Sequence, residues 1–380
     1  MPIRLLTFST LFPNNARPNH GVFVENRLRH LVASGAVSSD VVAPVPWFPS
    51  AHPWFGDWIV RHPRFPVLPR FGMSLAPVLL YRAMLPMVRR LIAEGPGFDA
   101  IDAHYLYPDG VAAVWLGQHF GLPVVLTARG TDVSLIPQFA RPRRLILQAI
   151  AGAAAVIAVS AALRQALIEI GAPEAKISVL RNGVDTTVFR PPADRPAARA
   201  ELGFVRPTLI SVGLLIERKG HHRTIEAMTQ LPDFDLVIIG EGPERDRLNA
   251  LVLRSGLGDR VRLAGPRPHA ELPLWYGAAD ASVLSSSREG WANVLLESMA
   301  CGTPVVASPI WGNPEVVRSP AAGVITRENS ADGIAEAVRR LFASPPSREA
   351  TWAYAEPFSW DETTAGQLAV FRRVIAERGG

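Results

Sequence analysis

The stretch SREGWANVLLESMACGTPVVAS, Ser287–Ser308, carries two glutamates, Glu289 and Glu297, on either side of an apolar run. The ASVLSSS before it is strand-like. The stretch itself predicts a turn, a helix over roughly residues 293–301 and a second strand, TPVVAS. A helix N-terminus at the end of a strand binds phosphate, and flanking carboxylates suit neutral sugar hydroxyls. Either glutamate alone fits an ordinary turn or helix position, but the pair in this setting predicts a ligand site.

Strand-like and helical segments alternate through both halves of the chain. In the first half IRLLTFST, SDVVAPVP, FDAIDAHY, LPVVLTARG and AVIAVS are strand-like, and FVENRLRHLVAS, DGVAAVWLGQHF and AALRQALIEIG are helical. The second half repeats the alternation from PTLISVGLL to TPVVAS. Such alternation predicts parallel, doubly wound sheets.

One segment breaks the alternation: RNGVDTTVFRPPADRPAARAELG, which predicts a turn and a Pro-rich linker. We therefore expect an α/β chain with an N-terminal Rossmann-like domain over residues 1–190 and a C-terminal one over residues 191–358. A helix over residues 359–380 is expected to return to the first domain. Ligands of such sheets bind beyond the carboxyl ends of the strands, so two facing domains would enclose a deep cleft.

Length and composition agree with this organisation. The chain has 380 residues, 48% of them hydrophobic and 19% charged, which indicates a packed two-domain protein. Its single cysteine, Cys301, excludes an internal disulfide and fits a reducing compartment, so we expect a cytoplasmic protein. The uncharged span at residues 145–163 ends in β-like AVIAVS. It predicts a buried helix and a buried strand in preference to a membrane span.

Charge is spread unevenly along the chain. Residues 1–190 hold 18 Lys and Arg against 11 Asp and Glu, a net +7, whereas residues 191–380 hold 21 against 23, a net −2. A basic half without a clustered stripe favours anionic lipid or a phosphate-bearing substrate over nucleic acid. Arginine supplies nearly all of the positive charge, because Lys176 and Lys219 are the only lysines.

Several segments carry a family resemblance. EGWANVLLE, Glu289–Glu297, resembles the E-x7-E element of retaining glycosyltransferase family 4, and MACGTPVVAS resembles its continuation. VGLLIERKGHHRTIEAM resembles the family's phosphate loop, and the similarity extends to IIGEGPERDRL, RVRLAG, WYGAADASVLSSS, LRNGVDTTVF, HGVFVENRLRHL and AHYLYPDG. The resemblance implies a GT-B fold with domains facing across a cleft, a UDP- or GDP-sugar donor, no metal ion and no other cofactor. It also implies a role in bacterial cell-envelope polysaccharide synthesis.

The resemblance assigns roles in the second half of the chain. Glu289 would contact hydroxyls of the donor sugar, Glu297 the nucleotide ribose, and Lys219 the diphosphate. A compact ammonium suits a diphosphate, and the scarcity of lysine supports this role independently. Many relatives have arginine after the first glycine of the loop, where this chain has Leu214, and Arg218 is a candidate substitute. The remaining candidates for donor contact are Gly213, Asn293 and Val294; Glu315, with Asn313 nearby, is a weaker one.

Candidates in the first half lie at predicted strand ends. Gly21 suits close approach of a phosphate to the backbone, although a plain turn glycine explains it nearly as well. Arg129 in TARGTD stands where relatives have histidine, and we expect it to meet donor or acceptor, with Asp132 beside it. His104 is a candidate acceptor-binding residue or a satisfied loop histidine. Residues 46–72, rich in aromatics, Pro and Arg, fit either membrane or lipid-linked acceptor contact or an ordinary packed loop.

Three alternatives remain beside retaining glycosyl transfer. A nucleotide-sugar 2-epimerase or hydrolase on the same fold would need its own acid–base pair, and none is evident. A non-catalytic nucleotide-sugar-binding scaffold would keep Lys219 and Glu297 but make Glu289 dispensable. A nicotinamide dehydrogenase is disfavoured because GEGPER lacks the third glycine of G-x-G-x-x-G.

Overall fold

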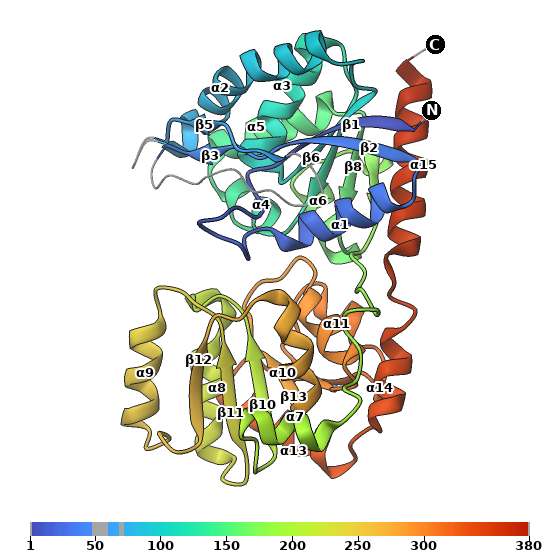
Figure 1. The fold of residues 1–380 in the computed structure, drawn as a ribbon. Coiled ribbons are helices and arrows are strands. Elements are labelled where there is room, and N and C mark those ends of the chain that lie inside the picture. Colours follow the sequence, from blue (N-terminus) through green and yellow to red (C-terminus); the bar gives the residue numbers. More distant parts are fainter. Residues whose placement is uncertain (1, 48–59, 68–71, 379–380) are drawn as a thin grey trace. The chain divides into compact units, whose positions relative to one another are not determined.

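The computed structural model describes residues 2–47, 60–67 and 72–378. The chain divides into two compact units. The first unit comprises Met1–Asn182 and Trp360–Gly380, and the second comprises Gly183–Ser359. Each unit is built around one parallel sheet with helices on both faces (Figure 1).

The sheet of the first unit has seven strands in the order β4-β2-β1-β6-β7-β8-β9, and every paired neighbour is parallel. Its strands are β1 (Ile3–Phe8), β2 (Val37–Val42), β4 (Val60–Arg61), β6 (Ala100–His104), β7 (Val124–Ala128), β8 (Ala155–Ala158) and β9 (Ile177–Val179). A separate pair is formed by β3 (Val45–Pro46) and β5 (Arg64–Phe65). Strands β6, β7 and β8 are buried along their whole length, which explains their lack of polar alternation.

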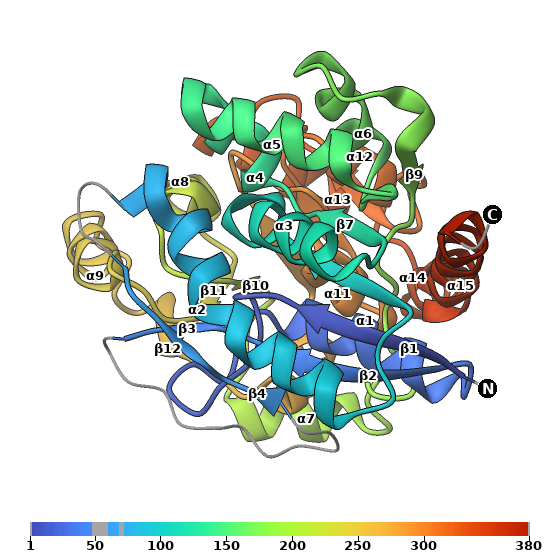
Figure 2. The same cartoon turned by 90° about the horizontal axis from the view of Figure 1, so that it is seen from above.

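Helices cover both faces of this sheet. They are α1 (Val22–Ala33), α2 (Gly72–Glu94), α3 (Val111–Phe120), α4 (Thr131–Ser134), α5 (Ala140–Gly152), α6 (Ala161–Glu169) and α15 (Trp360–Arg378). Helices α1 and α15 share one face, where Leu31, Val370, Phe371 and Val374 join Leu5 of β1 in a single core cluster. Figure 2 shows α3 lying between α2 and α5, against which it packs.

The second unit has a six-stranded sheet in the order β12-β11-β10-β13-β14-β15, again with parallel neighbours. Its strands are β10 (Thr208–Val212), β11 (Asp235–Ile239), β12 (Val261–Gly265), β13 (Ala281–Leu284), β14 (Val305–Ala307) and β15 (Gly323–Ile325). Its helices are α7 (Arg195–Leu202), α8 (His221–Ala227), α9 (Arg245–Arg254), α10 (Leu272–Ala278), α11 (Asn293–Ala300), α12 (Asn313–Val316), α13 (Ala331–Ala343) and α14 (Arg348–Ala355).

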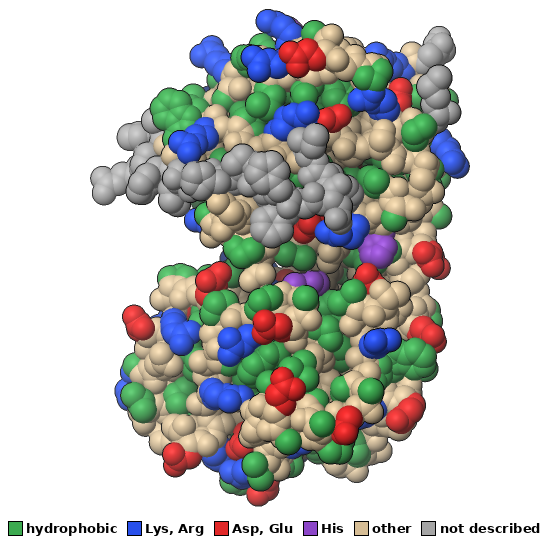
Figure 3. Space-filling view, viewed as in Figure 1, with side chains coloured by type: hydrophobic (Ala, Val, Ile, Leu, Met, Phe, Trp, Pro, Cys, Tyr) green, Lys and Arg blue, Asp and Glu red, His purple; other side chains and the backbone are tan. Residues whose placement is uncertain are grey.

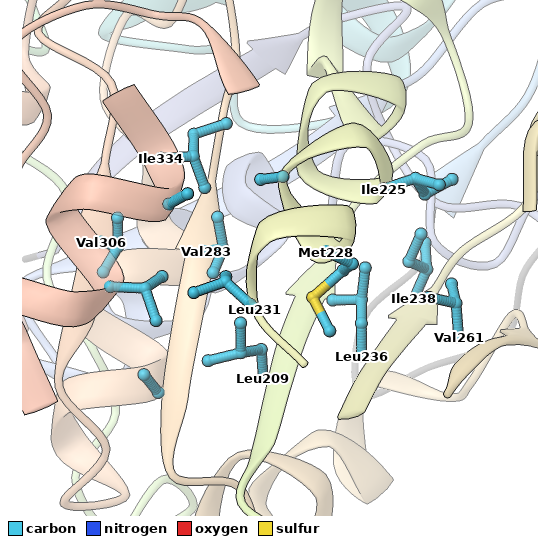
Figure 4. Close-up of a cluster of buried hydrophobic side chains, with 14 of the residues drawn as sticks. Leu209, Ile225, Met228, Leu231, Leu236, Ile238, Val261, Val283, Val306 and Ile334 are labelled. Carbon is cyan, nitrogen blue, oxygen red and sulfur yellow. The ribbon is translucent and has the colours of Figure 1, made fainter. Parts of the chain in front are cut away.

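The core of the second unit joins its strands to α8 and α13 (Figure 4). Val283 and Val306 project from neighbouring strands toward Ile334 of α13, while Ile225 of α8 lies at the opposite side of the cluster and Met228 lies between them. All five side chains are at most 1% exposed. Burial of such side chains stabilises a fold by about 1.5–3 kcal/mol each, so this layer fixes the sheet on which the loops are mounted.

The predicted strands and helices are largely confirmed, with one correction. The segment predicted as a linker contains α7, because Asp194 accepts a hydrogen bond from the Ala197 N–H at 2.9 Å, Pro196 occupies the first turn and Gly203 ends the helix with φ 70°. These are ordinary helix start and stop signals, which the density of prolines obscured. The uncharged span at residues 145–163 is confirmed as the end of α5, then β8 and the start of α6.

Two surface observations bear on membranes and charge. In the part of the chain that the structure describes, no helix is both long and apolar enough to cross a bilayer. On the face of the second unit drawn in Figure 3, basic and acidic side chains are interspersed with hydrophobic ones. Residues 48–59 and 68–71 of the aromatic stretch 46–72 lie outside the described residues, so its contact with membrane or acceptor stays a prediction.

Gly220 lets the loop after β10 touch the end of β13. Its φ is 70°, and a Cβ there would lie 2.1 Å from the backbone oxygen of Ser285. The Ser285 hydroxyl donates to the Gly220 carbonyl at 2.8 Å, and the Ser287 N–H donates to the Arg218 carbonyl at 2.8 Å. Two loops that are 65 residues apart in sequence are therefore joined at backbone level.

We predict that Gly220→Ala destabilises the protein far more than Gly203→Ala does. Both glycines have φ 70°, but an added Cβ at Gly203 meets nothing within 4 Å. The control variant should therefore lose about 1 kcal/mol from the left-handed backbone alone, whereas Gly220→Ala should lose about 3 kcal/mol or more because Ser285 must move. Urea unfolding measures both, and equal losses would contradict the contact.

Candidate functional site

The order of the second sheet reverses between β10 and β13, which are neighbours although β11 and β12 intervene in sequence. Ligands of open parallel sheets bind beyond the carboxyl ends of the strands at such a switch point. Two loops begin at this switch point: residues 213–220 follow β10, and residues 285–292 follow β13. They contain Gly213, Arg218, Lys219 and Glu289.

Three charged side chains meet at this switch point. The Lys219 Nζ donates to Oε1 of Glu289 at 2.6 Å, and an Arg218 Nη1 lies 3.9 Å from Oε2 of the same carboxylate. The Ser286 hydroxyl also donates to Oε1, at 2.7 Å. The Glu289 side chain is only 9% exposed, so the pair is largely desolvated. The predicted grouping of Lys219 with the first glutamate is therefore present in the folded chain.

This environment keeps Glu289 ionised. Burial alone would raise the pKa of Glu289, but the charges of Lys219 and Arg218 and the hydrogen bonds from Lys219 and Ser286 lower that pKa below its ordinary value. An ionised carboxylate only accepts hydrogen bonds. Glu289 is thus suited to gripping hydroxyl groups and poorly suited to donating a proton.

Helix α11 begins four residues after Glu289, at Asn293 and Val294. Ala292 holds the N-cap position, where its side chain makes no hydrogen bond. Because Lys219 contacts Glu289, the ammonium lies against the segment that leads into this helix end. A lysine ammonium and a helix N-terminus are both favourable for an anion, and here one short loop carries both.

Glu297, one turn inside α11, has a different partner. Its Oε1 lies 2.9 Å from Nε2 of His269, in the 3₁₀ turn His269–Glu271 before α10. The Glu297 side chain is 11% exposed. Burial, followed by the neighbouring Glu297 charge, raises the pKa of Tyr276 well above its ordinary value. The two glutamates thus contact different partners, Lys219 and His269.

The remaining candidates of the second unit are placed as follows. Gly213 runs alongside the Lys219 side chain, and an added Cβ would lie 3.5 Å from its Cδ. Leu214 is 52% exposed, while Arg218 Nη1 donates to the Arg288 carbonyl at 3.1 Å, beside Glu289. Asn313 is buried and its amide donates to the Ser308 carbonyl at 3.1 Å, and Glu315 is half-buried in α12.

The first sheet reverses in the same way between β1 and β6. Gly21 lies in the segment after β1, with φ 73°, and a Cβ there would lie 2.3 Å from the carbonyl carbon and oxygen of Leu11. Gly21 therefore allows close packing against the backbone of Leu11, in the chain's own loop. That packing explains the residue without a phosphate.

His104 ends β6 and is 1% exposed. Its Nε2 lies 3.1 Å from Asp102 and its Nδ1 lies 2.7 Å from Nη2 of Arg129. A guanidinium only donates, so Nδ1 accepts and the proton sits on Nε2, facing the carboxylate. Because Nδ1 accepts, the ring is neutral; burial, only partly opposed by the charge of Asp102, also lowers the pKa of His104. Both ring nitrogens are satisfied.

Arg129 is already committed to protein partners. Besides His104, it donates from Nη1 to the side-chain oxygen of Asn182 at 3.2 Å, and the fully buried Arg27 donates to the same oxygen at 3.1 Å. Burial, followed by the charge of Arg27, lowers the pKa of Arg129 to about 9. Its guanidinium also lies 5.2 Å from the Phe23 ring centroid.

Asp132 departs from its expected acceptor-binding role. Its carboxylate accepts backbone N–H groups of Leu106, Gly130 and Arg129 at 2.9, 2.7 and 3.1 Å, and the residue is 0% exposed. Both oxygens are used to shape the loop that carries Arg129. Asp132 therefore positions its neighbour and offers no open carboxylate to a ligand.

Sequence reasoning missed several members of these clusters. They are Arg27, Asp102, Asp109, Asn182, His269 and Ser286. Asp109 is 0% exposed and accepts from the N–H and hydroxyl of Thr10 at 2.7 and 2.9 Å. Burial raises the pKa of Asp109 to about 7. Among the described residues, no group of three or more His, Cys, Asp or Glu is arranged to hold a metal ion.

Comparison with known proteins identifies the family. The model for group 1 glycosyl transferases matches residues 194–357, and the model for glycosyltransferase family 4 matches residues 20–188. A D-inositol 3-phosphate glycosyltransferase from Catenulispora acidiphila is 30% identical over 98% of this chain and 96% of its own length. This chain belongs to the glycosyltransferases of group 1 and family 4.

Solved structures of low identity agree on the fold of this glycosyltransferase. Sucrose-phosphate synthase from Thermosynechococcus elongatus has a TM-score of 0.83 at 20% identity, covering 99% of this chain and 100% of the other. Anabaena HepE in complex with UDP-glucose has a TM-score of 0.74 at 20% identity, covering 97% and 100%. The predicted GT-B fold of two Rossmann-like units is confirmed.

We predict that the stability cost of Lys219→Met depends on pH. Near neutral pH the variant leaves a buried Glu289 carboxylate without its main partner, which should cost about 3 kcal/mol. Without Lys219, burial raises the pKa of Glu289, so the carboxylate protonates at a higher pH and the cost shrinks as the pH falls to about 5.

Lys176→Met is the matched control for this measurement. The Lys176 ammonium donates to the carbonyls of Ala151 and Ala153 at 2.6 and 2.8 Å, and carbonyls do not titrate. Its cost should stay constant over the same range. Urea unfolding at several pH values gives both curves, and parallel curves would contradict a charge pair at Glu289.

A second pH dependence is expected for Asp109. Its folded-state pKa near 7 exceeds its ordinary value, so the wild type loses stability as the pH rises from about 4 to about 7. Asp109→Asn stays neutral and should therefore gain about 2–4 kcal/mol over the wild type across that range. Asp246→Asn, at an exposed site, is the control and should not gain stability relative to the wild type over this range. If the stability difference from wild type does not change with pH for either variant, Asp109 is ionised without cost.

Proposed function

We propose that this glycosyltransferase moves a sugar from a UDP- or GDP-sugar to a saccharide or lipid-linked acceptor, with retention of anomeric configuration. One observation carries the proposal: the Lys219 ammonium and the buried Glu289 carboxylate meet at 2.6 Å at the switch point, on the loop that leads into α11. The HepE structure supports the donor class, because that protein is solved with UDP-glucose. The second unit is the proposed donor side and the first the acceptor side.

Donor binding is proposed to separate the Lys219–Glu289 ion pair, so that each side chain contacts a different part of the ligand. The diphosphate would take Lys219 and the amide end of α11 at Asn293 and Val294, with Gly213 and Arg218 lining the same loop. Glu289 would then accept hydroxyls of the sugar, still held by Ser286. Negative charge grows on the diphosphate as the anomeric C–O bond breaks, and fixed positive groups stabilise it there.

Retention is proposed to arise from attack on the face that the leaving diphosphate vacates. Glu289 carries a lowered pKa and a lysine partner, which make it a weak nucleophile and favour a hydroxyl-binding role. Charge stabilisation by Lys219 and the helix end requires no metal ion, so turnover should survive EDTA. Arg129, with His104 held beside it, is the proposed contribution of the acceptor side.

The acceptor has a second candidate class. Residues 1–190 carry a net charge of +7, which favours an anionic acceptor. The relative from Catenulispora acidiphila is named for D-inositol 3-phosphate, so a phosphate-bearing polyol or sugar belongs in the acceptor panel beside lipid-linked saccharides. The same charge supports a cytoplasmic enzyme in peripheral contact with an anionic membrane, in cell-envelope polysaccharide synthesis.

One turnover assay distinguishes glycosyl transfer from the two alternative functions. An epimerase or hydrolase would consume the donor without acceptor, and a binding scaffold would bind donor without turnover. The assay uses the full chain, UDP- and GDP-sugars selected by thermal shift, and a panel of phosphorylated and lipid-linked acceptors. The anomeric configuration of the product, read by NMR, tests retention.

We predict that Glu289→Gln lowers kcat by about 100-fold, because a neutral amide grips the sugar hydroxyls less well as charge develops. Affinity for the free nucleoside diphosphate should change by less than about 3-fold, since that ligand lacks the sugar. Glu201→Gln, exposed on α7, is the matched control and should behave as wild type. Unchanged turnover in Glu289→Gln would remove this residue from the site.

A further inference from the structure

His269 fixes one oxygen of the Glu297 carboxylate. Its Nε2 lies 2.9 Å from Oε1, and in this pair the ring N–H donates to the carboxylate. The Glu297 side chain is 11% exposed and that of His269 29% exposed. An exposed His–Glu pair would contribute little, but this carboxylate is largely desolvated, so the bond restricts its rotamer.

The imidazole is itself held in place. The Phe189 ring packs edge-on against it, with centroids 5.0 Å apart and planes at 61°. Phe189 is 2% exposed and lies 6.4 Å from the Tyr276 ring of α10, the helix that directly follows the His269 turn. Phe189, itself packed near Tyr276, therefore supports the ring that carries the donor nitrogen, and both residues lie outside the E-x7-E element.

We propose that His269 is a positioning residue for the nucleotide: by holding Oε1 of Glu297, it directs the other carboxylate oxygen at the ribose hydroxyls of the donor. The inference rests on the proposed function, and on the nucleotide-ribose contact that the family resemblance assigns to Glu297. A carboxylate fixed before binding loses no further rotamer freedom when the ribose arrives. His269 therefore sets how strongly the site distinguishes a ribose from a sugar that lacks its hydroxyls.

The test compares UDP with 2′,3′-dideoxy-UDP by isothermal titration of the full chain; GDP and its dideoxy analogue replace them if only guanosine nucleotides bind. The wild type should prefer UDP by about 50-fold, because the dideoxy analogue offers no hydroxyl to the second oxygen of the buried carboxylate. His269→Phe keeps the ring contact with Phe189 but has no N–H to donate. Its preference should fall to about 5-fold, with kcat at saturating donor unchanged and the donor KM raised.

Three further variants make the result decisive. His269→Gln retains an N–H donor and should recover most of the preference. Phe189→Leu, which removes the ring contact but leaves the N–H of His269 in place, should fall between wild type and His269→Phe. His119→Phe is the matched control: His119 also packs edge-on against an aromatic ring, Phe120, at 4.7 Å, and its change should leave the preference intact.

Each outcome has one meaning. An unchanged ribose preference in His269→Phe, or an equal loss of affinity for both nucleotides, overturns the positioning role. If His269→Phe does not fold, the Gln and Leu variants give the same comparison. If the wild type binds neither nucleotide, the proposed function fails; if it binds both nucleotides of a pair equally, the assignment of Glu297 to the ribose fails and the positioning role with it.

Discussion

The backbone contact between Gly220 and Ser285 is the constraint on which the site depends. It brings the loop after β10 against the end of β13, and only a residue without a side chain fits there. Because of that contact, Lys219 stands within 2.6 Å of Glu289, 70 residues away in sequence. The parallel sheet and the cluster of Val283, Val306 and Ile334 hold both strand ends in register, so the loops inherit their geometry from the core.

Charge is arranged differently in the two units. In the second unit a cation and an anion face each other across one short contact, and a ligand that carries both phosphate and hydroxyl groups can replace each half of the pair. In the first unit Arg129 donates to His104 and to the side-chain oxygen of Asn182, and the carboxylate of Asp132 accepts backbone N–H groups. These side chains are thus engaged with one another and with the backbone. This cluster is better suited to orienting the neutral imidazole of His104 than to binding a phosphate.

Much of the fold and part of the site could be predicted from the sequence. Buried strands without polar alternation mark a parallel sheet, the scarcity of lysine draws attention to Lys219, and the spacing of Glu289 and Glu297 fits a strand, loop and helix. Residues whose partners are remote could not be found this way. Arg27 meets Asn182 across 155 positions, and His269 meets Glu297 across 28, so neither pairing leaves a local pattern. Helix α7 was missed because a run of prolines resembles a linker, although Asp194 and Gly203 are ordinary start and stop signals of a helix.

The pattern of misses follows from what local sequence encodes. Backbone propensity, capping and burial act over a few residues, and they fix where a strand ends and a helix begins. The switch-point rule then places those ends side by side, which is why strand order and loop position together predict that Lys219 and Glu289 share one site. Side chains that support a functional group from behind obey no such rule. His269 needs only a nitrogen within reach of Glu297, and any of several elements around α11 can supply one. The sequence around Glu297 therefore does not by itself identify the residue that supports it.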